Sequence, residues 1–107
     1  MPESKDLKWV EIDLSAVAQN TAWVVSRLEA GARLMAVRKA DPYPHGAVQV
    51  SRVALKAGAS CLGVRDLSEA TELRRGGIKD PVHLLAPILP EQAPLAARLD
   101  LSVPVDA

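Results

Sequence analysis

Four side chains that can exchange protons or react covalently fall within the segment AVRKADPYPHG, residues 36–46: Lys39, Asp41, Tyr43 and His45. A lysine amine that loses proton affinity through desolvation becomes a nucleophile toward an aldehyde, so Lys39 is the candidate for covalent chemistry. The pattern alone leaves a plainer explanation open, in which Lys39 is solvated and begins a loop. Asp41 is equally typical of a turn, and His45 of local hydrogen bonding in a loop.

The residues before Lys39 show how it would be positioned. The run 32–37 is short, apolar and bounded by turn signals, which is typical of a strand buried on both faces. Side chains alternate along a strand, so Met35, Val37 and Lys39 share one face. Lys39 then lies at the carboxyl end of its strand, where barrel enzymes place their catalytic residues.

Strand and helix patterns alternate along the chain. Ser15 and Ser68 are expected to cap helices, Pro94 to lie in the first turn of a helix, and Arg74-Arg75 to form a solvated helix end. The helix after Ser15 should bury a stripe that includes Val17. We expect strands at 9–14, 32–37, 60–64, 81–87 and 101–105, and helices at 16–30, 47–57, from 68 to 75, and 91–99.

This order predicts an α/β fold made of parallel βα units. No G-x-G-x-x-G sequence marks a doubly wound sheet, so we favour a partial (β/α) TIM-type barrel. Its three to four βα units would follow an N-terminal strand and helix. A closed eight-stranded barrel takes about 250 residues. The 107 residues are therefore expected to form one segment of such a domain, residues 1–107, without a C-terminal β domain.

Composition narrows the function classes. The 13 basic and 13 acidic residues balance, which gives no electrostatic reason to expect nucleic acid or an anionic membrane as a partner. No run approaches the ~20 apolar residues of a membrane span. The single Cys61 cannot form an internal disulfide, which favours a cytoplasmic protein. His45, His83 and Cys61 are widely separated and show no metal-ligand spacing, so we expect no metal.

The lysine segment resembles the pyridoxal-phosphate signature of alanine racemases, which reads approximately A-V-V-K-A-[DN]-A-Y-G-H-G. The lysine, alanine, aspartate, tyrosine, histidine and final glycine match in register, and Arg38, Pro42 and Pro44 depart. The flanking WVEIDLSAVAQN is similar to the family's opening W-x-E-I-[DN]-L-x-A-[LV]-x-x-N. The stretch LKAGASCLGV…LSEATELRRGGI is similar to its second βα unit, so the resemblance spans nearly the whole chain.

The resemblance implies a role for three residues. Lys39 would hold pyridoxal 5'-phosphate covalently and act as one of two bases, Tyr43 would hydrogen-bond the cofactor phosphate, and Leu85 would line the cofactor. The implied reaction interconverts L- and D-alanine for cell-wall synthesis. In the family the second base is a tyrosine from the partner subunit's C-terminal domain, which implies a homodimer and an inactive isolated segment.

Two other classes of function stay open. Arg38, Pro42, Pro44 and the missing second base fit an inactive fragment that serves as a structural or interaction piece. Pro44 occupies a position where the family usually has glycine, and proline cannot reproduce a loop that needs positive φ there. A single-barrel pyridoxal-phosphate-binding protein is the third reading. Exposed strand edges predict self-association of the chain, and serine is an alternative substrate to alanine.

Overall fold

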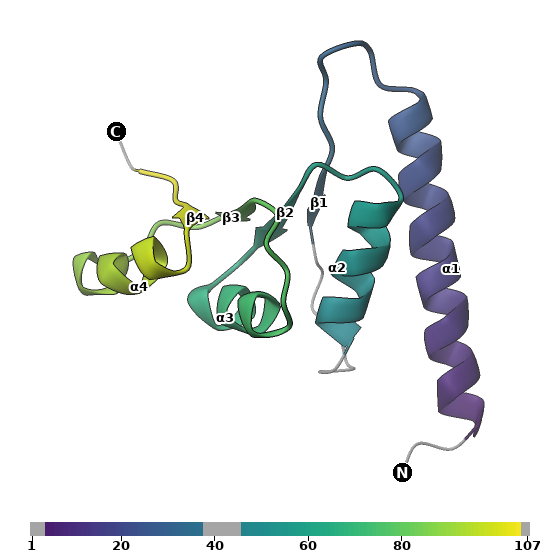
Figure 1. Ribbon diagram of the computed structural model, residues 1–107, viewed down its shortest axis with the longest axis horizontal. Helices are drawn as coiled ribbons and strands as arrows, with labels where there is room; N and C mark the ends of the chain where they lie inside the picture. The colour runs from purple at the N-terminus through teal and green to yellow at the C-terminus, as the bar shows by residue number, and fades with distance from the viewer. Residues whose placement is uncertain (1–3, 38–45, 106–107) are drawn as a thin grey trace.

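The computed structural model describes residues 4–37 and 46–105. Four parallel strands and four α-helices alternate along this part of the chain (Figure 1). In order, the elements are α1 (Ser4–Ser26), β1 (Met35–Val37), α2 (Gly46–Lys56), β2 (Cys61–Val64), α3 (Leu67–Arg75), β3 (Val82–Leu84), a 3₁₀ turn η1 (Pro90–Gln92), α4 (Ala93–Arg98) and β4 (Leu101–Ser102).

The strands form one sheet in the order β1-β2-β3-β4, so strands that are consecutive in the sequence are neighbours in space. All three pairs are parallel, with Met35 opposite Cys61, Leu62 opposite Val82, and Val82 opposite Leu101. A helix connects each strand to the next, as parallel pairing requires. This is the predicted α/β architecture of a partial (β/α) barrel.

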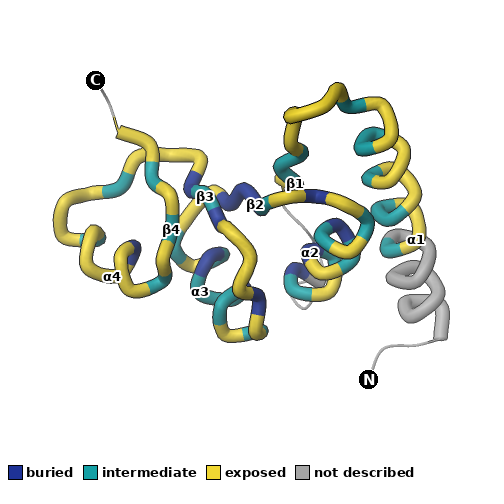
Figure 2. The backbone as a smooth tube through the Cα atoms, turned by 45° about the horizontal axis from the view of Figure 1, so that its top comes forward, coloured by how far each residue is buried: buried dark blue, intermediate teal, exposed yellow. Residues whose placement is uncertain are grey.

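The helices lie on one side of the sheet, and the core lies between them and the strands (Figure 1). Alternate strand residues point into this core: Leu62 and Val64 of β2, and Val82 and Leu84 of β3, are at most 4% exposed. The buried positions concentrate around β2, β3 and the inner sides of α2 and α3 (Figure 2). On the helices and the turn that follows, small and branched apolar residues complete the core: Ala47, Ala70, Leu73 and Ile78.

The other face of the sheet has no helix over it within the described part of the chain. We call it the open face, and strand alternation assigns to it Met35, Val37, Cys61, Gly63, His83 and Leu85. Val37 is 53% exposed and Leu85 is 45% exposed. The prediction that the strand at 32–37 is buried on both faces was therefore wrong, because β1 is an end strand with only one face covered.

The predicted strand at 9–14 was also wrong. These residues belong to α1, which runs without a break from Ser4 to Ser26. A helix satisfies its own backbone hydrogen bonds, whereas a strand needs a neighbouring strand, and β2 alone pairs with β1 in the described sheet. Leu14, Val17 and Thr21 continue the spacing of a helical stripe, so this segment carries both patterns. Ser15 consequently lies inside the helix and caps nothing.

Two helix ends differ in detail from the sequence prediction. Asp66, not Ser68, caps α3, because its Oδ1 accepts a hydrogen bond from the Glu69 backbone N–H at 2.9 Å. Pro94 does fall in the first turn of α4, as predicted. Gly58 ends the turn after α2 with φ of +122°, a conformation that favours glycine.

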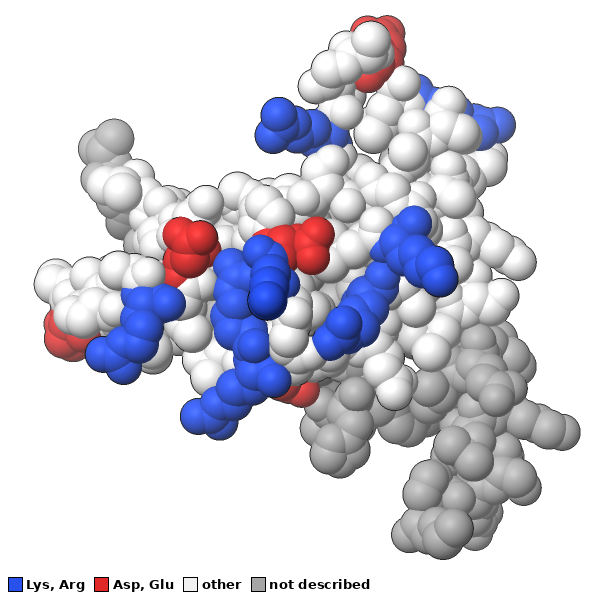
Figure 3. Space-filling view, viewed as in Figure 1, with Lys and Arg blue, Asp and Glu red and all other residues white. Residues whose placement is uncertain are grey.

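Acidic and basic side chains both appear on the face of the molecule seen in Figure 3. In the described part of the chain, no helix is both long enough and apolar enough to cross a membrane.

Candidate functional site

The carboxyl ends of β1, β2 and β3 meet at one edge of the sheet because the strands are parallel. β1 ends at Val37, two residues before Lys39 in the sequence. Lys39 and Tyr43, which the sequence proposes as cofactor ligands, lie outside the described residues, as does the whole range 38–45 with its arginine, prolines, Asp41 and His45. The structure therefore describes the strand that leads to Lys39 and the neighbouring strand ends.

Leu85 follows β3 and lies beside the last residue of β2, Val64. Its backbone N–H donates to the Val64 carbonyl at 2.8 Å, which extends the β2–β3 ladder by one residue. Its side chain is 45% exposed on the open face. Leu85 therefore lies at the same edge of the sheet as the end of β1, and its role toward a cofactor stays a prediction.

Gly63 brings the side chains of the open face together. A Cβ atom at this position would lie 2.8 Å from Met35 Sδ and 3.2 Å from Val37 Cγ2. It would also lie 3.3 Å from Leu85 Cδ1. The missing side chain lets these three residues converge over the backbone of β2. We call this cluster of Met35, Val37, Gly63 and Leu85 the apolar floor.

Arg65 and Glu69 form an ion pair just beyond the carboxyl end of β2. Arg65 Nη2 and Nε donate to Glu69 Oε1 at 3.0 and 3.2 Å, and the Arg65 backbone N–H donates to Oε2 at 3.1 Å. The Glu69 side chain is 13% exposed, whereas that of Arg65 is 56% exposed. The pair holds a guanidinium at the edge of the sheet where β1 also ends, with its charge balanced by one carboxylate.

The sequence prediction missed this ion pair. Arg65 and Glu69 are four residues apart, a spacing that permits contact on a helix. The stronger signal was position, because Arg65 directly follows the last residue of a buried strand.

His83 and Cys61 belong to β3 and β2, and both are partly buried. Strand alternation puts them on the open face. Within residues 4–37 and 46–105, no group of three or more His, Cys, Asp or Glu side chains could hold a metal ion. These two residues therefore contribute no ligand cluster to the candidate site.

The prediction that Arg74 belongs to a solvated helix end was wrong. Its guanidinium is only partly exposed and donates to the backbone carbonyls of Leu99, Ile78, Asp80 and Asp100 at 2.7 to 3.1 Å. The neighbouring Arg75 is exposed, as predicted, and makes no hydrogen bond with another described residue. Arg74 thus joins the end of α3 to the turns that precede β3 and β4, away from the edge that carries the candidate site.

Comparison with known proteins gives one consistent match. The family model described as "Alanine racemase, N-terminal domain" matches residues 12–107. The chain is 42% identical over 95 residues to alanine racemase 1 of Bacillus subtilis, which covers 89% of this chain and 24% of that protein. It is 46% identical over 98 residues to the alanine racemase of a Nostoc species, which covers 91% and 25%.

Solved structures agree with the sequence matches. The alanine racemase of E. faecalis superposes with a TM-score of 0.79 at 40% identity, covering 86% of this chain and 25% of that one. The alanine racemase of Bacillus anthracis, solved with bound L-Ala-P, gives a TM-score of 0.79 at 36% identity, covering 86% and 24%. The chain thus spans about a quarter of the length of the relatives that it matches.

Proposed function

Since this chain belongs to the alanine racemase N-terminal domain family, we propose that it forms the cofactor-binding N-terminal portion of a pyridoxal-phosphate-dependent alanine racemase. The observation that carries this proposal is the apolar floor at the edge where β1 ends, two residues before Lys39. The bound L-Ala-P of the Bacillus anthracis relative supports an alanine-sized substrate. The proposed role is interconversion of L- and D-alanine in the cytoplasm, with D-alanine supplied for cell-wall synthesis.

The apolar floor fits the shape of pyridoxal phosphate. The cofactor has a flat aromatic ring, and a flat ring needs an apolar surface without a protruding side chain at its centre. Gly63 provides that gap, and Met35 Sδ, Val37 Cγ2 and Leu85 Cδ1 surround it. A methionine sulfur at a ring edge is a favourable contact. The described residues of the floor are therefore compatible with the ring, and Leu85 is the residue proposed to line it.

The proposal assigns the chemistry to Lys39. Bound pyridoxal phosphate supplies an electron sink that makes the α-carbon of an amino acid acidic. The Lys39 amine is proposed to hold the cofactor and to take or return the α-proton on one side of that carbon. Tyr43 is proposed to donate a hydrogen bond to the cofactor phosphate. The apolar floor would exclude water from one face of the ring.

Racemisation requires a base on each side of the planar α-carbon. Lys39 is the base that this chain is proposed to supply. The family pattern assigns the other base to a tyrosine of the partner subunit, so the active form is proposed to be a homodimer with further chain beyond this segment. The 107 residues alone are accordingly expected to bind cofactor without racemising alanine.

Covalent labelling tests the assignment of Lys39. The chain is incubated with pyridoxal phosphate, reduced with borohydride and analysed by peptide mass mapping. Lys39 should be labelled in preference to Lys5, Lys8, Lys56 and Lys79. The variants Tyr43→Phe and Leu85→Ala should each lower the labelling of Lys39, and Lys56→Arg should leave it unchanged.

The same experiment separates the proposed function from its rival. Labelling spread evenly over all five lysines would show that no cofactor site exists in this chain. The chain would then be better described as an inactive structural or interaction piece. Racemisation of L-alanine by the purified chain, lost in Lys39→Ala, would contradict the argument that a second base is required.

A further inference from the structure

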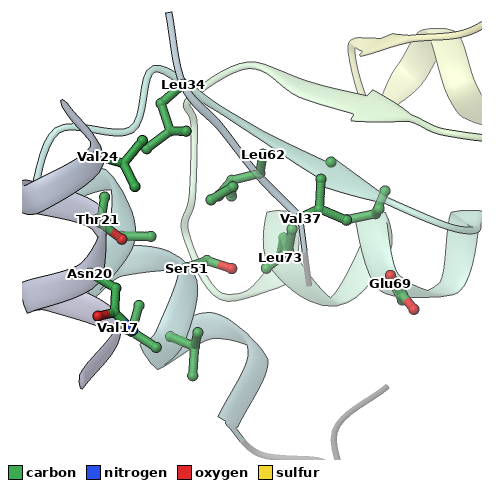
Figure 4. Close-up of a pocket in the computed structure, with 15 residues that line it drawn as sticks. Val17, Asn20, Thr21, Val24, Leu34, Val37, Ser51, Leu62, Glu69 and Leu73 are labelled. Atoms are coloured by element: carbon green, nitrogen blue, oxygen red, sulfur yellow. The ribbon is translucent and has the colours of Figure 1, made fainter. Parts of the chain in front are cut away.

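A cavity of about 620 Å³ lies beside β1, lined mainly by residues of the helix-covered side of the sheet and also by Val37 and Gly63. α1 contributes one wall, with Val17, Thr21 and Val24, and α2 and β2 contribute others (Figure 4). Valine, leucine and alanine make up most of the lining. Ligand pockets in proteins measure about 300 to 1,000 Å³ and are lined mainly by apolar side chains with a few polar groups. The cavity has the size and the lining of such a pocket.

Within the described residues, Ser51 is the one polar side chain that is buried, with 6% of its surface exposed. It lies on α2, and Figure 4 shows its side chain directed into the cavity, toward Leu73. The Ser51 hydroxyl makes no hydrogen bond with any described residue. A buried hydroxyl without a partner is unfavourable, because it has lost its hydrogen bonds to water. This residue therefore marks the position where a ligand's polar group would be stabilised.

The charged group at the cavity is already paired. Glu69 lines the cavity, and its carboxylate accepts three hydrogen bonds from Arg65. A charged ligand would have to leave water for walls such as Leu34 and Leu62 without a free charge to meet it. A neutral ligand meets no such penalty. The lining therefore selects against ions and in favour of apolar molecules.

We propose that this cavity binds a small neutral apolar molecule that carries one hydroxyl or carbonyl group, with that group hydrogen-bonded to the Ser51 hydroxyl. A hydroxyl can donate and accept, so Ser51 can serve either kind of partner. The apolar part of the ligand would lie against Val24, Leu34 and Leu62. The cavity also borders on the apolar floor, because Val37 and Gly63 line both. The hydrogen bond proposed for the Ser51 hydroxyl needs no cofactor on Lys39.

Hexanol and hexane are suitable probes, because they share an alkyl chain and differ by one hydroxyl. Each is titrated into the protein while the backbone amide signals are followed by heteronuclear NMR. Hexanol should shift the signals of residues around the cavity, such as Thr21 and Leu62. Ser51→Ala should weaken hexanol binding about five-fold, the value of one ordinary hydrogen bond, and leave hexane binding unchanged.

Two further variants complete the test. Ser68→Ala changes an exposed serine of α3 and should bind both probes as the unmodified protein does. Ser51→Leu puts a larger side chain into the cavity and should block both probes. Without a probe, Ser51→Ala should melt at the same temperature as the unmodified protein or higher, because it removes an unpaired buried hydroxyl.

Three results would overturn the proposal. In the first, hexanol leaves the signals of the cavity residues unchanged. In the second, Ser51→Ala binds hexanol as tightly as the unmodified protein. In the third, Ser51→Ala lowers the melting temperature in the absence of probe, which would show that the hydroxyl has a structural partner in solution and is not available to a ligand.

Discussion

Replacing Arg74 by alanine should destabilise the protein more than any other single change at an exposed or half-exposed arginine. Its guanidinium Nε donates to the Leu99 carbonyl at 2.8 Å, and Nη1 donates to the carbonyls of Ile78 and Asp80 at 3.0 and 2.7 Å. Nη2 donates to the Asp100 carbonyl at 3.1 Å. These carbonyls belong to the turns that lead into β3 and β4, so one side chain holds both turns against the end of α3.

The size of the effect follows from how these bonds are buried. A hydrogen bond to a charged group contributes about 1.5 to 3 kcal/mol. The bonds to Leu99 and Ile78 are partly buried, whereas those to Asp80 and Asp100 are exposed and can be replaced by water. Counting the two partly buried bonds at the lower value and the exposed bonds at zero gives about 3 kcal/mol. This loss should lower the melting temperature by more than about 10 °C.

Urea denaturation followed by far-ultraviolet circular dichroism measures this loss. Arg75→Ala is the matched control, because Arg75 is the next residue of the same helix and is exposed. Surface substitutions of this kind change stability by about 0.5 kcal/mol or less. Arg74→Lys should recover less than half of the loss, since one ammonium cannot reach carbonyls in several directions. Equal stability of Arg74→Ala and Arg75→Ala would refute the assignment of Arg74 as a structural cross-link.

Other substitutions test single contacts of the fold. Gly76→Ala should cost about 1 to 3 kcal/mol by denaturation, because the new Cβ would lie 2.5 Å from Val48 Cγ2; wild-type stability would show that the two helices can separate without penalty. Asp66→Ala should cost about 1 kcal/mol through loss of the α3 cap, and Ser68→Ala should cost nothing measurable. In sizing with light scattering at micromolar concentration, the chain should exceed its monomer mass of 11.4 kDa, and Val37→Lys should reduce that association; a sharp monomer peak would contradict the prediction.

The order of strands and helices could be predicted because each buried strand is a short apolar run between turn signals. Residues 60–64 illustrate this, since such a run is typical of a strand in a parallel sheet, and the structure has β2 at Cys61–Val64. Gly58 could be predicted to end a helix, because glycine readily adopts the left-handed conformation that it has here. Local signals of this kind do not depend on the rest of the fold.

Features that depend on distant partners could not be predicted. The segment 9–14 alternates like a strand, yet it also carries helical spacing, and the choice between them depends on whether another strand pairs with it. Arg74 was expected to be solvated because sequence spacing cannot show carbonyls that lie 25 residues away, such as that of Leu99. The cavity and the unpaired hydroxyl of Ser51 likewise result from how α1 and α2 pack on the sheet.

The candidate site was predictable in part. Met35 and Val37 share a face, as predicted, and lie together beside Leu85, because strand alternation fixes the face of every residue once the register is set. The Arg65–Glu69 pair was missed because its place near the end of β1 follows only from the pairing of β1 with β2, which the sequence does not show. The roles of Lys39 and Tyr43 stay predictions, since both residues lie outside the described part of the chain.

Cofactor binding and assembly should be coupled through the open face. Parallel sheets normally have both faces covered, because their side chains are apolar on both sides. In this chain the helices cover one face, and Val37 and Leu85 remain 53% and 45% exposed on the other. Those same residues belong to the floor proposed for the cofactor ring. A protein contact that buries Val37 and Leu85 therefore occupies the surface proposed for the ring, so pyridoxal phosphate and self-association through this face should weaken each other.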